Sequence, residues 1–432
     1  MDKKKVDYLV VGTGAGGATL AKELSNKGKT VLVLEKGKYE KKLGTFQDSL
    51  RFYDANQLTK IPRKSKEGVI IWRTIMAGGS TIVSCGNGTR CLQKELSDLG
   101  IDLEEEMTET EKEMNIKPMS EEFLSAGSKK IMQAAKELGY KMQPMPKFID
   151  PEKCKNCGQC AFGCSRDAKW TALDYLDKAI EQGVGIEYNV SIERVLSDKG
   201  KAIGVRGVSQ NGWQDYFADI VILAAGGLGT PVILQNSGIQ NAGSGLFVDL
   251  LMNTYGVTDN ISQKNEPVMA LIDGEFHDKK GFILSTFINT SPMVRFIELG
   301  PKGLALPSNR LIGMMNKTAD DTNGHVYSNG TISKPITDED WKRLREGSAI
   351  AKEILLKAGA KSNSILFSKV QGAHPGGTAA IGKIVDKDLQ TEIENLYVCD
   401  ASVLPRSPGM PPILTICALA KKLTKNLSKL KR

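Results

Sequence analysis

The first forty residues show a pattern of apolar and polar positions that predicts three successive elements. The apolar run from Tyr8 to Val11 is typical of a buried strand. A glycine-rich turn follows it, and the next stretch, through Leu24, has the character of a helix. A second apolar run, "TVLVLEKG", reaches Glu35 and predicts another strand. The chain therefore begins with a strand–turn–helix–strand unit.

Leucines at helical spacing near the other end predict a closing helix that packs on the body: Leu419, Leu423, Leu427 and Leu430. No apolar run approaches the roughly 18 residues that a membrane-spanning helix needs. The short apolar run near the amino terminus leads directly into glycines, which is unlike a signal peptide. We therefore expect a cytoplasmic protein without a transmembrane segment, in a reducing compartment where clustered cysteines bind metal or do redox work.

Length and charge limit the number of domains and the kinds of partner. The 432 residues, 41% of them hydrophobic and 25% charged, can bury a large core and form two domains. The net charge of +8 is spread along the chain, and only "MDKKK" and the tail are densely basic. Because no nucleic-acid motif accompanies these patches, we expect a solvated basic surface and no nucleic-acid partner; an acidic protein or a lipid surface is the alternative.

The glycine turn carries the first chemical prediction. Gly12 permits the tight turn, Gly14 lets a pyrophosphate approach the backbone, and Gly17 allows close packing of helix and strand. Free N–H groups at the helix start would bind the phosphates, and Glu35 lies where an acid binds a ribose diol. The motif predicts a dinucleotide but does not separate FAD from NAD.

The carboxy-terminal segment resembles the end of the glucose-methanol-choline (GMC) oxidoreductases, which are FAD-dependent. The resemblance rests on His374-Pro375, Gly377-Thr378-Ala379, Gly382, Val385-Asp386, Leu389, Asn395-Leu396-Tyr397-Val398, Asp400-Ala401-Ser402, Pro405, Pro412 and Thr415.

Three further stretches resemble segments of that family in the same order. They are "AGGSTIVSCGNGTR" (77–90), "GCSRDAKWTALDYLDKAIEQG" (163–183) and "VILAAGGLGTPVILQNSGI" (221–239). The resemblance implies that FAD is the cofactor. Beside Gly12, Gly14, Gly17 and Glu35, it implies cofactor contacts at Gly78, Gly79, Ser80, Val190, Ala225, Gly226, Asp400 and Ala401.

The resemblance also implies the architecture, an α/β fold with a discontinuous FAD domain. Residues 1–95, 150–246 and 367–432 would form a Rossmann-like FAD-binding domain with a parallel sheet and flanking helices. Residues 96–149 and 247–366 would form a smaller α+β substrate domain with an antiparallel sheet.

His374 stands at the family's catalytic position, which implies that it takes the hydroxyl proton of an alcohol while a hydride passes to the flavin. Imidazole suits this because its pKa lies near neutrality. His277 and His325 are the weaker candidates. The family's second active-site residue, usually His or Asn, is replaced by Pro411, which has no donor. His374 acts alone, Asn87 or a neighbour of Met410 compensates, or the reaction is not simple alcohol oxidation.

Four cysteines within eleven residues carry the last prediction. Cys154, Cys157, Cys160 and Cys164 have the C-x2-C-x2-C-x3-C spacing of bacterial ferredoxins, which favours a 4Fe–4S cluster. Zinc and unliganded or redox-active thiols are the alternatives. Cys164 is the weakest ligand, so a 3Fe–4S cluster or replacement by Cys85 or Cys91 stays open. Cys399 and Cys417 lie in apolar runs and predict small core residues.

A cluster would give the flavin's electrons a one-electron route to a carrier protein such as a ferredoxin, a cytochrome or a quinone-linked subunit. We therefore expect a dehydrogenase of alcohols, polyols or sugars rather than an oxidase, with a small molecule as substrate. The alternatives are a ferredoxin-driven reductase of a carbonyl or alkene, and a non-catalytic electron-transfer subunit.

Overall fold

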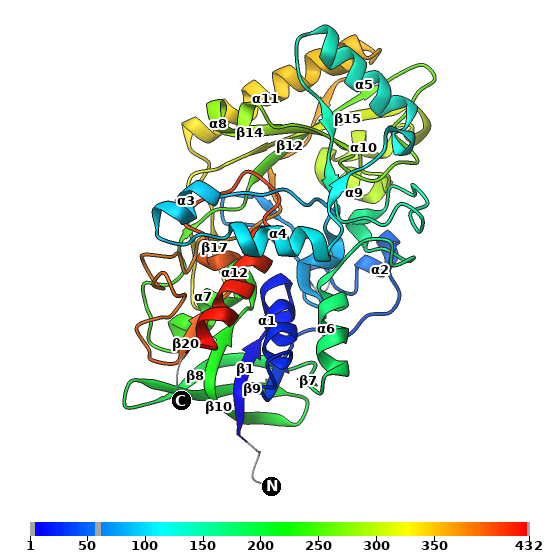
Figure 1. Ribbon diagram of the computed structural model, residues 1–432. Coiled ribbons are helices and arrows are strands. Elements are labelled where there is room, and N and C mark those ends of the chain that lie inside the picture. The colour runs from blue at the N-terminus through cyan, green and yellow to red at the C-terminus, as the bar shows by residue number, and fades with distance from the viewer. Residues whose placement is uncertain (1–4, 57–61, 430–432) are drawn as a thin grey trace.

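The computed structural model describes residues 5–56 and 62–429. Residues 1–4 of the basic "MDKKK" patch and Leu430 of the predicted closing helix lie outside the described residues. Two large sheets organise the chain, one at the lower end of the view and one at the upper end (Figure 1).

The first sheet has seven strands in the order β7-β2-β1-β10-β9-β8, with β20 paired to β10. Strands β7, β2, β1, β10 and β20 are parallel to one another, while β9 and β8 are antiparallel. Parallel strands are covered on both faces, which explains the continuous apolar runs of the sequence. The strands are β1 (Val6–Val11), β2 (Val31–Leu34), β7 (Gly185–Glu187), β8 (Ser191–Asp198), β9 (Lys201–Ser209), β10 (Gly212–Leu223) and β20 (Leu396–Val398).

Helices cover this first sheet and join distant parts of the chain. Helix α1 lies beside both α6 and α12, so the blue start and the red end of the chain are neighbours (Figure 1). Leu419, Leu423 and Leu427 of α12 are at most 3% exposed, which confirms the predicted closing helix over its described part. The helices are α1 (Ala15–Ser25), α6 (Ala172–Glu181), α7 (Gly226–Asn236) and α12 (Ile413–Leu427).

The second sheet is mainly antiparallel and has eight strands, in the order β3-β19-β12-β15-β14-β13-β5 with β18 paired to β12. Helices α11 and α5 cover one face of it, where Ile354, Leu355 and Ile131 pack on strand residues. The strands are β3 (Ile70–Ile71), β5 (Gln143–Pro144), β12 (Leu250–Val257), β13 (Leu271–Asp273), β14 (Phe282–Thr286), β15 (Leu311–Thr318), β18 (Leu366–Phe367) and β19 (Gln371–Gly372), and the helices α5 (Ala126–Glu137), α8 (Phe276–Lys280), α9 (Pro292–Leu299), α10 (Pro301–Leu304) and α11 (Asp338–Lys357).

The remaining elements are mostly short. Turns η1 (Gly79–Val83) and η3 (Cys160–Phe162) pack against each other. The others are α2 (Phe46–Ser49), α3 (Gln93–Asp98), α4 (Glu104–Glu113), β4 (Lys117–Pro118), η2 (Glu121–Phe123), β6 (Pro146–Lys147), β11 (Ser244–Leu246), η4 (Ser308–Arg310), β16 (Gly324–Val326), β17 (Ile332–Ser333), η5 (Ser362–Ser364) and η6 (Ala401–Val403).

The predicted fold class is confirmed, because a parallel sheet with flanking helices accompanies an antiparallel sheet with its own helices. The domain boundaries stay a prediction. Cys399 and Cys417 are fully buried, as expected of small core residues. In the described part of the chain, no helix is long and apolar enough to cross a membrane.

Candidate active site

A cavity of about 530 Å³ opens where the turn after β1 meets the ends of β2 and β10. The cations Lys36, Arg63 and Arg73 also line it and add positive charge suited to phosphates. Seven of the residues predicted to bind the cofactor line this cavity: Gly12, Gly14, Glu35, Gly79, Ser80, Val190 and Ala225.

Glu35, at the end of β2, is held rigidly beside the glycine turn. Its Oε2 accepts hydrogen bonds from the Thr13 N–H at 3.0 Å and the Thr13 hydroxyl at 2.6 Å, and its Oε1 accepts from the Gly37 N–H at 2.7 Å. Burial raises the pKa of Glu35, although these hydrogen bonds act in the opposite direction. Thr13 therefore orients the carboxylate predicted to bind a ribose, a role that the glycine motif does not signal.

The glycines of the turn show that a dinucleotide fits this cavity. A Cβ at Gly14 would meet no protein atom within 4 Å, so it would fill the cradle where a phosphate belongs. At Gly12, φ is +102° and a Cβ would lie 2.4 Å from the carbonyl oxygen of Ala224. At Gly17 a Cβ would lie 2.0 Å from the carbonyl oxygen of Gly12. The turn is thus open toward the ligand and tight against the protein, which suits the pyrophosphate of FAD.

Four other predicted cofactor residues do not line this cavity: Gly17, Gly78, Gly226 and Asp400. Asp400 is tied to the protein itself. One of its oxygens accepts from the Gly226 N–H at 2.8 Å and the Thr230 hydroxyl at 2.6 Å, and the other accepts from the Ser402 N–H at 2.7 Å. It therefore joins the end of β20 to the start of α7. The last predicted residue, Ala401, lines a second cavity.

The second cavity, of about 270 Å³, shares Ser80 with the first and lies against the second sheet. Its lining is largely apolar, and one face of the sheet forms part of it through Leu251, Asn253, Met315, Lys317 and Gln371. These residues belong to three adjacent strands, in which Leu251 is opposite both Lys317 and Gln371 and Asn253 is opposite Met315. The alternation of strand side chains places all five on the same face.

His374 lines this second cavity and is held by a buried carboxylate. Its Nδ1 lies 2.7 Å from Oδ2 of Asp249, whose side chain is fully buried. Because a carboxylate only accepts, Nδ1 carries the proton and Nε2 is left as the basic nitrogen. Burial lowers the pKa of His374 and Lys317 lowers it further, whereas Asp249 raises it.

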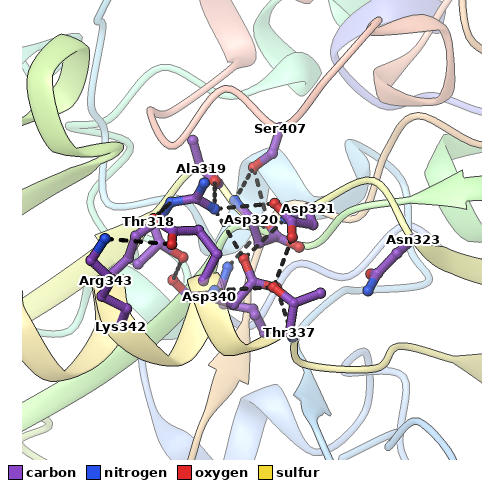
Figure 2. Close-up of polar contacts among 12 residues, drawn as sticks. Thr318, Ala319, Asp320, Asp321, Asn323, Thr337, Asp340, Lys342, Arg343 and Ser407 are labelled. Carbon is purple, nitrogen blue, oxygen red and sulfur yellow. Dashed lines mark hydrogen bonds and ion pairs between the residues drawn. The ribbon is translucent and has the colours of Figure 1, made fainter.

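A network of buried polar groups fixes Asp249 in turn. Oδ1 of Asp249 accepts from the Ser407 hydroxyl at 2.6 Å and from the Gly409 N–H at 3.0 Å. Ser407 also lies 2.9 Å from Asp320, whose carboxylate accepts from the N–H of Val248 at 3.1 Å, next to Asp249. Figure 2 shows Ser407 and Asp320 facing each other at the end of β15.

Lys334 and Arg343 surround the carboxylates behind this network. Lys334 Nζ forms a fully buried ion pair with Asp320 at 3.0 Å. Arg343 donates to Asp340 and to Asp321, each at 3.2 Å, and these residues cluster around Asp320 (Figure 2). His374 is therefore supported through Asp249 by a chain of buried polar groups that ends in an ion pair.

The other sequence candidates for catalysis are engaged elsewhere. His277 Nε2 bonds to the Pro408 carbonyl at 2.7 Å and His325 Nδ1 lies 3.2 Å from Ser244, and neither histidine lines the cavity. Pro411 lines it without a donor. Asn87 also lines it, but its Oδ1 accepts from Lys147 at 2.5 Å and its Nδ2 contacts the sulfur of Met269 at 3.1 Å.

The cysteine loop forms part of the cavity wall through Ala161 and Phe162. Across residues 5–56 and 62–429, no three His, Cys, Asp or Glu side chains are grouped to hold a metal. The predicted ligands Cys154, Cys160 and Cys164 are half-buried and Cys157 is exposed. As placed, their side chains therefore do not form a metal site.

The same loop nevertheless keeps its thiols near one another. Burial raises the pKa of Cys154, and the thiols of Cys160, Cys157 and Cys164 act in the same direction. The Ala168 N–H points at the sulfur of Cys164 over 3.4 Å. The proposed substitutes are more deeply placed: burial raises the pKa of Cys85 to about 11 and that of Cys91 to about 12.

Sequence reasoning missed Asp249 and Lys317, and both carried a signal. Asp249 interrupts "GLFVDLLM" and Lys317 interrupts "LIGMMNKTAD", which are otherwise apolar runs. A charged residue in a buried strand is rare unless it is paired or functional. Asp249 also has φ of +52°, a conformation that aspartate tolerates better than most residues.

Comparison with known proteins identifies the family of this chain. Two sequence models of GMC oxidoreductases match residues 6–264 and 318–420. An uncharacterised protein of Methanocaldococcus jannaschii is 32% identical over 98% of this chain and 99% of its own length. A long-chain-alcohol oxidase of Arabidopsis thaliana is 24% identical over 98% of this chain and 68% of its own length. The crystal structure of a pyridoxine 4-oxidase from Mesorbium loti has a TM-score of 0.75 at 16% identity, covering 99% of this chain and 100% of that one, which shows a shared fold.

Proposed function

We propose a specific reaction on the premise that the chain belongs to the GMC oxidoreductase family, as the matches over residues 6–264 and 318–420 and the 32% identical relative show. The chain is accordingly an FAD-dependent oxidoreductase. The proposed reaction is the oxidation of an alcohol carried on an apolar group. The observation that carries it is His374, paired with the buried Asp249, on the wall of a largely apolar cavity.

FAD, when bound, supplies an acceptor for the hydride that leaves the alcohol carbon. Gly12 and Gly14 leave room for its pyrophosphate, and Glu35 is placed for a ribose. His374 accepts the hydroxyl proton at Nε2, because Nδ1–H is fixed by Asp249. The largely apolar walls would bind the apolar part of the alcohol.

The chain length of the alcohol gives the test. We expect 1-octanol to reduce the flavin of the holoenzyme under anaerobic conditions faster than ethanol or glucose, because apolar residues such as Leu251, Phe287 and Met315 line the cavity. The measurement is the loss of oxidised-flavin absorbance after rapid mixing. The name of the Arabidopsis relative, a long-chain-alcohol oxidase, supports this preference. If neither 1-octanol nor any shorter alcohol bleaches the flavin, the proposed function is wrong.

The cysteine loop supports a second proposal, that the enzyme is a dehydrogenase with an iron–sulfur cluster. Support comes from the spacing of Cys154, Cys157, Cys160 and Cys164 and from the contact of their loop with the cavity. Because the thiols as placed are not grouped around a metal, their side chains would have to turn together to bind one.

Iron and sulfide content tests this second proposal. For a 4Fe–4S cluster we expect about four irons and four sulfides per anaerobically purified chain, and an EPR signal when 1-octanol is added. A Cys157→Ser variant should lose the iron and keep the flavin. A protein without iron that passes its electrons rapidly to oxygen would instead be an oxidase. The electron-carrier partner and the cytoplasmic location stay predictions.

A further inference from the structure

Lys317 is a buried lysine in the sheet face that lines the apolar cavity. Only 2% of its surface is exposed, yet within residues 5–56 and 62–429 its ammonium has neither a hydrogen bond nor an ion pair. It stands in a row with Leu251 and Gln371 across three strands, and both neighbours line the same cavity. Its charge therefore faces the space in which a ligand would lie.

Other buried lysines of the chain have partners. Lys147 Nζ donates to the carbonyls of Cys85 and Val268, each at 2.9 Å, and to Asn87. Lys169 donates to three main-chain carbonyls, and Lys334 is paired with Asp320. A buried charge without a partner is costly, so Lys317 needs an explanation that these residues do not.

Among the described residues, four titratable groups interact electrostatically with Lys317. They are Asp249, the thiols of Cys85 and Cys91, and the imidazole of His374. Burial lowers the pKa of Lys317, whereas Asp249 raises it. Lys317 and His374 line the same cavity, so the ammonium lies in the space where the proton transfer is proposed.

The proposed reaction requires a hydrogen-bond donor at the substrate oxygen, beside His374. When His374 takes the hydroxyl proton, negative charge develops on the substrate oxygen and must be stabilised. Pro411 offers no donor, and Asn87 is held by Lys147 at Oδ1 and contacts the sulfur of Met269 through Nδ2, which leaves it a single N–H to offer. Lys317 is a donor on the cavity wall that is free of partners among the described residues.

We propose that Lys317 binds the oxygen of the substrate alcohol and stabilises the alkoxide that forms on it. This inference rests on the proposed function. In the step, the O–H proton moves to Nε2 of His374 and the electron pair of that bond forms the second carbon–oxygen bond. The C–H hydrogen leaves with its electron pair as hydride and reduces FAD. The Lys317 ammonium keeps all its protons throughout, so it is an electrostatic catalyst.

Substitution by methionine and by arginine tests the proposal. Lys317→Met should lower the rate of flavin reduction by 1-octanol about 10²–10³-fold, the usual effect of removing one such donor, and Lys317→Arg should recover part of it. Binding of hexanoate, followed by the flavin spectrum, should weaken about tenfold or more in Lys317→Met, because a carboxylate mimics the alkoxide. This binding needs no turnover, so it tests Lys317 even if no alcohol is oxidised.

Thermal unfolding separates a catalytic lysine from a structural one. Because methionine removes an unpaired buried charge, the Tm of Lys317→Met should equal or exceed that of the wild type. Lys147→Met is the matched control: it leaves three acceptors unpaired and should lower the Tm. The proposal is overturned if Lys317→Met keeps the wild-type reduction rate and hexanoate affinity, or if its Tm falls as far as that of Lys147→Met.

Discussion

The His374→Asn variant is expected to reduce its flavin with 1-octanol about 10²–10⁴-fold more slowly than the wild type, the range that a general base contributes. Asparagine can keep a hydrogen bond to Asp249, but it has no nitrogen that accepts a proton near neutral pH. Rapid anaerobic mixing measures the rate, and the FAD content of each variant shows that the cofactor is still bound. Because His374 lines the second cavity, the substitution should lower the rate of flavin reduction and leave the FAD content unchanged.

The control for this variant is His277→Asn. His277 bonds to the Pro408 carbonyl and does not line the cavity, so this variant should stay close to the wild-type rate. A His374→Asn protein that reduces its flavin at the wild-type rate would show that no proton is taken at this position. The chain would then be closer to an electron-transfer flavoprotein than to an alcohol-oxidising enzyme.

The dependence on pH follows from the same residue. Burial, and next Lys317, lower the pKa of His374 below its ordinary value of 6.5. The base acts in its neutral form, so kcat/KM for 1-octanol should rise with pH and reach its plateau near neutrality, with a midpoint below 6.5. In Lys317→Met the midpoint should move to higher pH, because the cation no longer opposes protonation of the imidazole.

The sequence predicted those parts of the fold that local signals specify. The turn at Gly12–Gly17 and the apolar run of β1 lie within twenty residues, so periodicity and glycine spacing were enough to recognise them. The same local reading could not foresee why Gly16 is a glycine. A Cβ there would lie 1.9 Å from the carbonyl oxygen of Cys399, a contact between opposite ends of the chain.

The candidate active site depends still more on contacts between distant parts of the chain. His374 came from a resemblance, but its partner Asp249 lies 125 residues away and meets it only because the chain before β12 passes the chain after β19. Lys317 faces the cavity because of the register of β15 against β12, which no short pattern encodes. The cysteine run gives the opposite case, since its spacing is a strong local signal whereas the described side chains form no metal group.

The second large effect is expected at the buried ion pair behind Asp249 and Ser407. Lys334→Met should lower the free energy of unfolding by about 3–5 kcal/mol at pH 8, because it leaves the buried Asp320 carboxylate without its counter-ion. Lys334 also donates to the Asp321 carbonyl and to Asn323, each at 2.7 Å, and both bonds are lost. Urea unfolding followed by fluorescence measures the change.

The size of this loss should depend on pH. Burial raises the pKa of Asp320 to about 6, Lys334 lowers it and Asp249 raises it. Since the folded pKa lies above the unfolded value of 3.8, the folded protein favours the protonated acid, and stability falls as the pH rises from 3.8 to 6. Without Lys334 the pKa of Asp320 rises further and this fall continues above pH 6. The variant should therefore lose more stability at pH 8 than at pH 5.

A neighbouring lysine supplies the control. Lys342 is next to Arg343 on α11 (Figure 2), but its side chain is 69% exposed and its pairing with Glu339 spans 3.6 Å. Lys342→Met should therefore change the unfolding free energy by less than about 0.5 kcal/mol at either pH. Equal effects of the two substitutions, or a loss in Lys334→Met that is the same at pH 5 and pH 8, would contradict the buried ion pair. Because Asp320 also contacts Ser407, which holds Asp249, Lys334→Met should slow flavin reduction as well as weaken the fold, whereas Lys342→Met should do neither.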